Sequence, residues 1–149
     1  MPISLIDFVQ GLISDNKQID GELAILTVNR VGVLSARGAL DFGGSEYDSP
    51  NVKWLSPEKE SEDDDYGWWT LDEGSYQLEL NETIVPHDAH PVVLQTWPAA
   101  LRAGVSHDTV MITEKTEHPT LQLHVPKTGI AIKENARITS AIPILTLTT

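Results

Sequence analysis

The stretch LQLHVPKTGIAI, residues 121–132, decides the fold class that the sequence predicts. Its first half alternates apolar and polar residues, and this period of two is typical of a strand with one buried face. A Pro-Lys turn signal follows, and a second apolar run then occupies residues 129–132. The pattern predicts two short strands separated by a turn.

The rest of the chain after residue 20 also consists of short apolar runs separated by turn residues. Further strand candidates occupy residues 23–28, 31–34, 76–80, 92–95, 110–112 and 142–147. Turn residues such as Asn29-Arg30, Gly43-Gly44 and Pro86-His87 separate them. Because no strand pattern alternates with a helical one, a doubly wound α/β fold is not expected. We therefore expect an all-β core built as a barrel or a sandwich.

One segment has helical periodicity, at residues 4–14. Ser4 and Asp7 have the spacing of a helix N-cap pair. The apolar residues that would share one helical face are Leu5, Ile6, Val9, Leu12 and Ile13. This pattern predicts a single N-terminal helix packed on the sheet.

Composition limits the possible functions. The 149 residues suit one domain, 1–149, and the formal net charge of −12 disfavours binding to nucleic-acid phosphates. The absence of cysteine excludes disulfides, thiolate zinc sites, iron–sulfur clusters and a cysteine nucleophile. No apolar run reaches the roughly 20 residues that span a bilayer, and the N-terminus does not resemble a signal peptide. We expect a cytoplasmic protein without a membrane partner.

Two local features invite a metal interpretation. The acidic run at residues 56–67 lacks the ligand spacing of an EF-hand, so a solvated loop is favoured, with Trp68 and Trp69 anchoring the strand that follows. His87 and His90 are flanked by prolines that argue against a helix aiming both at one ion. No metal-ligand set is predicted.

The order of five segments resembles that of the dCTP deaminase and dUTPase superfamily. The segments resemble, in turn, its Ala-Ser-Tyr-Asp-Leu-Arg-Leu-Gly stretch, the strand before its central motif, the tail of its Arg-Ser-Ser-Leu-Ala-Arg-Leu-Gly-Leu motif, its Thr-Leu-Glu-Leu strand and its closing Pro-Gly-x-x-Ile segment. In this chain they are residues 38–47, 76–86, 101–105, 120–123 and 129–138.

This resemblance implies a distorted β-barrel or jelly-roll-like fold of the dUTPase type. It also implies a homotrimer with active sites between subunits, and a deoxynucleoside triphosphate substrate whose phosphates carry Mg²⁺. Asp41, Arg102, Arg137 and Ser140 are the substrate-binding residues that the resemblance suggests.

The chain departs from the deaminase motifs at the chemical positions. Gln122 stands where the deaminases have the proton-shuttling Glu, and an amide cannot take a proton near neutrality. Pro98 and Ala99 replace the two motif serines, and Trp97 replaces the first motif Arg. Of the polar residues in that motif only Arg102 is retained.

The chain also departs from the dUTPase motifs. The position of the dUTPase general base, an Asp, aligns with Thr113, and Glu114 follows one residue later. Because a slip of one residue on a strand reverses the face, Glu114 is a weak substitute. Ser140 aligns with the Gln that follows the last motif Ile.

Three hypotheses follow. The first is a catalytically degenerate homologue that keeps the fold and nucleotide binding, with Trp97 and Pro98 making the cleft smaller and drier. The second is an active deaminase or hydrolase in which Arg102 binds phosphate or orients a water, Asp41 positions the metal-bound triphosphate, and Glu114 or Glu117 is the base. Gln122, Arg102 and Glu114 are the candidate catalytic positions. The third is a structural trimer module whose contact surfaces carry the tryptophans, at positions 54, 68, 69 and 97.

Cations are scarce in a chain with 10 Lys+Arg against 22 Asp+Glu. A triphosphate site needs local positive charge. The residues that we expect to supply it are Arg37, Arg102, Lys115, Lys127, Lys133 and Arg137.

Overall fold

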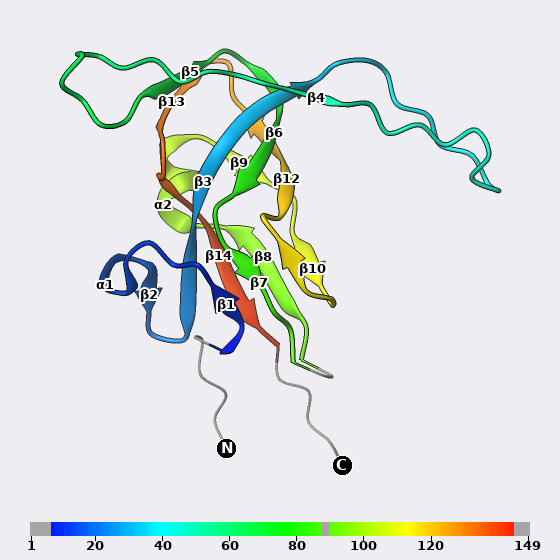
Figure 1. The fold of residues 1–149 in the computed structure, drawn as a ribbon, viewed down its shortest axis with the longest axis horizontal. Coiled ribbons are helices and arrows are strands. Elements are labelled where there is room, and N and C mark those ends of the chain that lie inside the picture. Colours follow the sequence, from blue (N-terminus) through cyan, green and yellow to red (C-terminus); the bar gives the residue numbers. More distant parts are fainter. Residues whose placement is uncertain (1–6, 88–89, 145–149) are drawn as a thin grey trace.

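The computed structural model describes residues 7–87 and 90–144, and β-strands dominate it (Figure 1). The strands are β1 (Val9–Gln10), β2 (Ile19–Asp20), β3 (Leu23–Leu34), β4 (Val52–Trp54), β5 (Trp68–Leu71), β6 (Gly74–Leu80), β7 (Thr83–Ile84), β8 (Val92–Thr96), β9 (Ser106–His107), β10 (Val110–Ile112), β11 (Thr116–Glu117), β12 (Thr120–Val125), β13 (Ile130–Lys133) and β14 (Arg137–Pro143). The helices in the described residues are short: α1 (Asp15–Gln18) and α2 (Pro98–Ala103). The prediction of an all-β core is confirmed.

Strand β3 is the spine of the main sheet because it pairs with four other strands along its length. Its first half pairs with β14 and β2, and its second half with β6 and β4. The sheet runs β10-β8-β14-β3-β6-β12-β9 and curls, while β1-β7-β11 and β13-β5 form two small separate sheets.

One hydrophobic core joins the three sheets. The main sheet contributes Leu26, Leu78 and Leu123, the β1-β7-β11 sheet contributes Ile84, and the β13-β5 sheet contributes Trp69. Because each small sheet has too little apolar surface to be stable alone, its burial against the curled main sheet holds it in place.

The turn predicted at Asn29 and Arg30 is wrong, because β3 continues through it with a bulge. Between Val28 and Arg30 the register against β6 shifts. Both polar side chains bond across to Glu79 on β6: Asn29 Nδ2 at 2.7 Å, and Arg30 with two N–H groups at 3.0 Å each. The bulge therefore accommodates two polar residues without ending the strand.

The helix predicted at residues 4–14 is wrong over its described part; residues 4–6 lie outside the described residues. Val9 and Gln10 form strand β1, paired with Ile84 and Thr83 of β7. Gly11 has φ 82, a left-handed conformation that a right-handed helix cannot contain. Pairing with β7 therefore outweighs the local helical pattern.

Among the described residues no helix is long and apolar enough to cross a membrane.

Two loops project from the sheet on opposite sides (Figure 1). One is the acidic loop between β4 and β5, confirmed as a largely exposed loop. At its end Trp69 is buried in the core and its Nε1 donates to the Leu55 carbonyl at 2.9 Å, which confirms the predicted anchor. The other joins β3 to β4, and we call residues 35–51 the arm.

Some strand predictions need adjusting. The final candidate, residues 142–147, corresponds to β14, which begins earlier, at Arg137; residues 145–149 lie outside the described residues. The sequence pattern missed β1, β2, β4, β7, β9 and β11, each of two or three residues. Strands this short have no recognisable period and form only where a neighbour offers pairing.

Candidate functional site: a cationic pocket beside a buried carboxylate

A fully buried carboxylate, Glu82, organises the region beneath the site. Its Oε1 accepts the Thr27 backbone N–H at 3.0 Å. Its Oε2 accepts the Thr27 hydroxyl at 2.6 Å and the Gln18 side-chain amide at 2.7 Å. Three donors therefore satisfy the two oxygens of this buried side chain, with no cation among the partners that the described structure gives it. This saturated group has a structural role.

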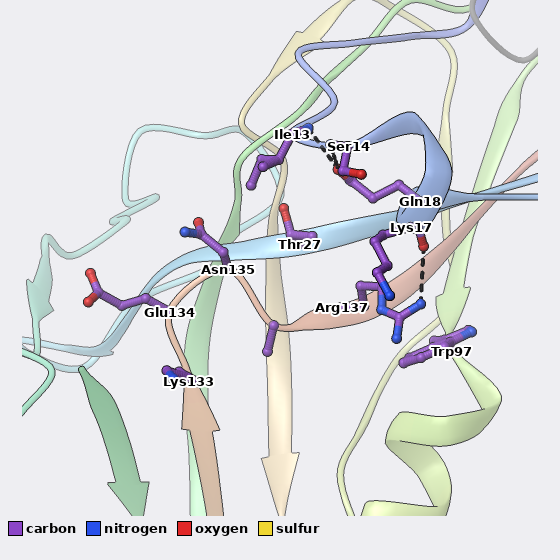
Figure 2. Close-up of a pocket in the computed structure, with 11 residues that line it drawn as sticks. Ile13, Ser14, Lys17, Gln18, Thr27, Trp97, Lys133, Glu134, Asn135 and Arg137 are labelled. Carbon is purple, nitrogen blue, oxygen red and sulfur yellow. Dashed lines mark hydrogen bonds between the residues drawn. The ribbon is translucent and has the colours of Figure 1, made fainter. Parts of the chain in front are cut away.

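Gln18 connects Glu82 to the backbone at the start of the short helix α1. Its Oε1 accepts the backbone N–H groups of Ile13 and Ser14 at 2.7 and 3.0 Å (Figure 2). Its Nε2 also donates to the Ile25 carbonyl at 3.0 Å. A helix of four residues is unstable alone, so this buried amide is what fixes α1 against β3.

On the other side of Thr27, the corner between β13 and β14 is fixed by Asn81 and Asn135. Asn81 Nδ2 donates to the Thr27 hydroxyl and to Asn135 Oδ1, both at 2.9 Å. Asn135 has φ 65, a left-handed conformation that asparagine tolerates better than most residues. The network therefore holds α1 and the β13–β14 corner in one arrangement.

Between these two elements lies an open pocket of about 480 Å³ that we call the cationic pocket. Its volume is within the range of small-molecule sites. Three of its lining residues are cations, in a chain of formal net charge −12. The lining residues are Ile13, Ser14, Lys17, Gln18, Thr27, Trp97, Lys133, Glu134, Asn135, Ala136 and Arg137.

Arg137 is the most constrained cation of the pocket. Its Nη1 donates to the Lys17 carbonyl at 3.1 Å, and its guanidinium carbon lies 4.7 Å from the centroid of the Trp97 ring (Figure 2). The contact with the indole is a cation–π interaction. A guanidinium carries five N–H donors, so donors remain for an anion after the bond to Lys17.

The other charged residues of the pocket have different neighbours. The Lys133 ammonium lies 5.6 Å from the centroid of the Trp68 ring. Glu134 Oε2 accepts the Gly67 N–H at 2.7 Å, so this carboxylate is tied to the start of β5. The pair next to Trp97 is therefore Lys17 and Arg137, and it forms the positive side of the pocket.

The sequence analysis named only part of this site. It selected Arg137 as a substrate-binding residue, named Lys133 among the expected cations, and expected Trp97 to narrow the cleft. It did not name Lys17, Gln18 or Thr27. Lys17 lies three residues beyond the helix predicted at residues 4–14, and nothing in the sequence placed it against Arg137. Lys17 reaches the site through the hydrogen bond that its carbonyl accepts from Arg137, and residues 120 positions apart leave no pattern in the sequence that would reveal this contact.

The other predicted site residues lie elsewhere. Arg102 is exposed on the last turn of α2, and Gln122 is exposed on β12, where it pairs with Gln77. Glu114 is exposed in the loop after β10, and Glu117 lies on β11 opposite Thr83. Neither Arg102 nor Gln122 lines the cationic pocket, and Trp97 forms part of its wall without filling it.

Asp41 and Ser140 have their own local environments. Asp41 lies in the arm, where its carboxylate accepts the N–H groups of Gly44 at 3.0 Å and Glu46 at 2.9 Å. Ser140 is buried in β14, and its Oγ has no hydrogen-bond partner within the described structure. Asp41 therefore caps a turn, as the Gly43-Gly44 signal predicted.

His107 is a buried titratable group on β9 that contacts Thr139, the residue before Ser140 on β14. Its Nδ1 lies 2.9 Å from the Asp108 carbonyl and its Nε2 lies 2.9 Å from the Thr139 hydroxyl. These partners fit a neutral ring with the proton on Nδ1. Burial, only partly opposed by the Asp108 carbonyl and charge, lowers the pKa of His107 from its ordinary 6.5.

Comparison with known proteins adds the fold family. No family model and no curated protein sequence matches the chain. Among solved structures, the chain is similar to the 2′-deoxycytidine 5′-triphosphate deaminase of Agrobacterium tumefaciens, with TM-score 0.61 and 12% identity over 91% of this chain and 41% of that one. It also aligns with a dUTPase of Staphylococcus bacteriophage 80alpha, with TM-score 0.39 and 10% identity over 87% of this chain and 94% of that one.

This chain has the dCTP deaminase fold. The resemblance seen in the sequence is thereby confirmed at the level of fold. The chain spans less than half the length of that deaminase chain, 41% of it. Asn135, which aligns with the Gly of the closing Pro-Gly motif in the sequence resemblance, has a φ of 65, a conformation that glycine adopts most easily.

Proposed function

We propose that this protein binds a deoxynucleoside triphosphate in the cationic pocket and does not deaminate it. The observation that carries the proposal is Arg137, held by the Lys17 carbonyl and the Trp97 ring on the wall of a pocket of about 480 Å³. A guanidinium fixed before binding loses less conformational entropy when it pairs with a phosphate. The ligand class comes from the dCTP deaminase fold.

The absence of deamination follows from the chemistry of the aligned residues. Water attack on the pyrimidine ring needs a group that takes and returns a proton, and an amide at Gln122 has no such capacity. Pro98 and Ala99, which begin α2, bring no hydroxyl to the position of the motif serines. Loss of a general base costs on the order of 100- to 10,000-fold in rate.

Three further features belong to the same proposal. Mg²⁺ would arrive with the nucleotide and be held mainly through its phosphates. The assembly would be a homotrimer in the cytoplasm, as the resemblance implies. The overall acidity of the chain opposes any anionic ligand, so Lys17 and Arg137 must dominate the local field.

A thermal-shift titration tests binding. The protein is titrated with dCTP, dUTP, dTTP and ATP, each with Mg²⁺, and a ligand that binds the native state raises the Tm until saturation. Arg137→Ala is expected to weaken binding by roughly 10- to 100-fold, the value of one lost hydrogen bond to a charged group. Lys53→Ala removes a charge on β4, outside the pocket, and serves as the control.

Two outcomes would overturn the proposal. If no nucleotide shifts the Tm, or Lys53→Ala weakens binding as much as Arg137→Ala, the pocket is not a nucleotide site. If Arg102→Ala abolishes binding and Arg137→Ala does not, the site is at α2. Steady conversion of dCTP to dUTP, followed by chromatography, would replace the degenerate hypothesis with the active one.

A further inference from the structure

The arm exposes large apolar side chains on an ordered scaffold. Leu40 is 89% exposed and Phe42 106% exposed, and Tyr47 follows a few residues later, also exposed. Single exposed apolar residues are common on protein surfaces, but several on one projecting element mark a surface for interaction.

The arm has a defined shape. Ala39 and Asp48 exchange two backbone hydrogen bonds, at 3.0 and 2.9 Å, and the Ser35 N–H donates to the Asn51 carbonyl at 2.9 Å. At the tip, both carboxylate oxygens of Asp41 accept backbone N–H groups. The tip therefore presents Leu40 and Phe42 in a preset geometry, which lowers the entropic cost of docking.

The arm points away from the part of the molecule that could receive it. In Figure 1 it extends to one side, in cyan, while α2 and β13 lie on the other side of β3. Within the described residues, the backbone hydrogen bonds of the arm outside the regular strands join only residues of the arm itself, and the arm continues into β3 and β4 at its two ends. Among residues 7–87 and 90–144 of one chain, none covers the apolar tip.

A matching acceptor lies beside α2. This α2 pocket, of about 190 Å³, has an apolar lining that includes Ala100, Ala103, Val105, Ile130 and Ile138. Lys133 and Arg137 also line it, and Arg102 follows Leu101 on the same helix.

Charge favours the same pairing. The arm carries Asp41, Glu46 and Asp48 against the single cation Arg37. Most of the surface of a chain with net charge −12 repels such an acidic element. The cations around α2 and the β13–β14 corner make that region the complementary one.

We infer that the arm docks on a second copy of this chain, with Phe42 and Leu40 inserted into its α2 pocket. The contact is heterologous, because the donor surface and the acceptor surface are different parts of the chain. Such contacts close into a ring when the rotation between copies allows it. The α2 pocket and the cationic pocket share Lys133, Ala136 and Arg137, but the docking is carried by the apolar tip and the apolar lining beside α2, so the assembly is tested without nucleotide.

Light scattering on a sizing column tests the assembly. The wild-type protein is expected to elute as more than one chain, and Phe42→Ser combined with Leu40→Ser as a single chain with an unchanged circular dichroism spectrum. Tyr66→Ser, which removes an exposed ring from the acidic loop, is the matched control and keeps the assembly. A monomeric wild-type protein, or a double variant that assembles normally, overturns the inference.

Disulfide trapping tests whether the arm docks in the α2 pocket. Because the chain has no cysteine, only the introduced thiols can form a disulfide. Phe42→Cys with Ala103→Cys is expected to give covalent oligomers under oxidising conditions, separated on a non-reducing gel. Phe42→Cys with Met111→Cys places the second thiol on an exposed position of β10 and should give none above background. Equal cross-linking in both pairs, or none in the first, places the arm elsewhere and overturns the inference.

Discussion

The side-chain amide of Gln18 donates a 2.7 Å hydrogen bond to the Glu82 carboxylate, although 64 positions separate the two residues. Both side chains are buried, so neither can exchange its partner for water. The pair connects the N-terminal segment to the turn between β6 and β7, and through Gln18 it sets the position of Lys17 at the cationic pocket.

Replacing Glu82 by Gln is expected to lower the free energy of unfolding by about 1–3 kcal/mol, because an amide N–H₂ would face groups that must donate. Urea denaturation measures the change. Glu62→Gln, in the exposed acidic loop, is the control and should stay within about 0.5 kcal/mol of wild type. Equal effects of the two substitutions would show that the buried network contributes nothing to stability.

Asn135 tests the left-handed corner between β13 and β14. Asn135→Ala loses the bond from Asn81 and keeps a Cβ at φ near 65, a conformation that costs an L-residue about 1–2 kcal/mol and that Ala, unlike Asn, cannot offset with a local side-chain hydrogen bond. Asn135→Gly loses the same bond without that backbone cost. The Gly variant should therefore melt at the higher temperature, and the opposite order would contradict the assignment.

Two neighbours on β14 should respond with opposite signs. Ser140→Ala removes a buried hydroxyl that has no partner in the described structure, so the free energy of unfolding should stay constant or rise by up to about 1 kcal/mol. Thr139→Val keeps the shape of the side chain but removes the hydroxyl that contacts His107 Nε2. This substitution should lower the free energy of unfolding by about 1–3 kcal/mol. A large loss in Ser140→Ala would mean that its hydroxyl is bonded in the folded protein.

His107 makes stability depend on pH. Because burial lowers its pKa in the folded state, the unfolded chain binds more protons just below the ordinary pKa of 6.5. The contribution of the neutral ring is therefore complete above that pH and declines as the pH falls towards the folded pKa. Urea midpoints of the wild type should fall over this window more than those of His107→Gln, and parallel curves for the two proteins would rule out the histidine as the source.

The sequence predicted β6, β8 and β12 nearly to their ends, divided β3 with a turn, placed β14 too late, and missed the short strands and the structure of the N-terminal segment. The alternating residues of β12 carry their period in the sequence itself, so they were identified with nearly correct ends. Val9 and Gln10 have a helical context, and their strand exists only because Ile84 and Thr83 offer pairing partners. At Asn29 and Arg30, polarity suggested a turn, whereas Glu79 on the neighbouring strand allows a bulge.

The residues of the candidate site were likewise predicted only in part from the sequence. The resemblance suggests Arg137 as a binding residue and identifies Trp97 only as a departure from the motif. The contact between the two could not be predicted because cation–π pairs have no characteristic sequence spacing. Asp41, Arg102, Gln122, Glu114 and Ser140 were also selected from motifs, and within one chain none of them lines the cationic pocket. Their roles remain predictions for an assembly of several chains.

The amino-acid sequence by itself determined the acidic character of the chain, the all-β class, the amide at Gln122 and the turn capped by Asp41, because charge, period and local turn chemistry are properties of neighbouring residues. Only the tertiary structure decided that Lys17 meets Arg137, that Glu82 is buried among three donors, and that Phe42 stands exposed on an arm. These facts join or separate residues far apart along the chain, and chain folding alone brings such residues within the few ångströms over which hydrogen bonds and packing act.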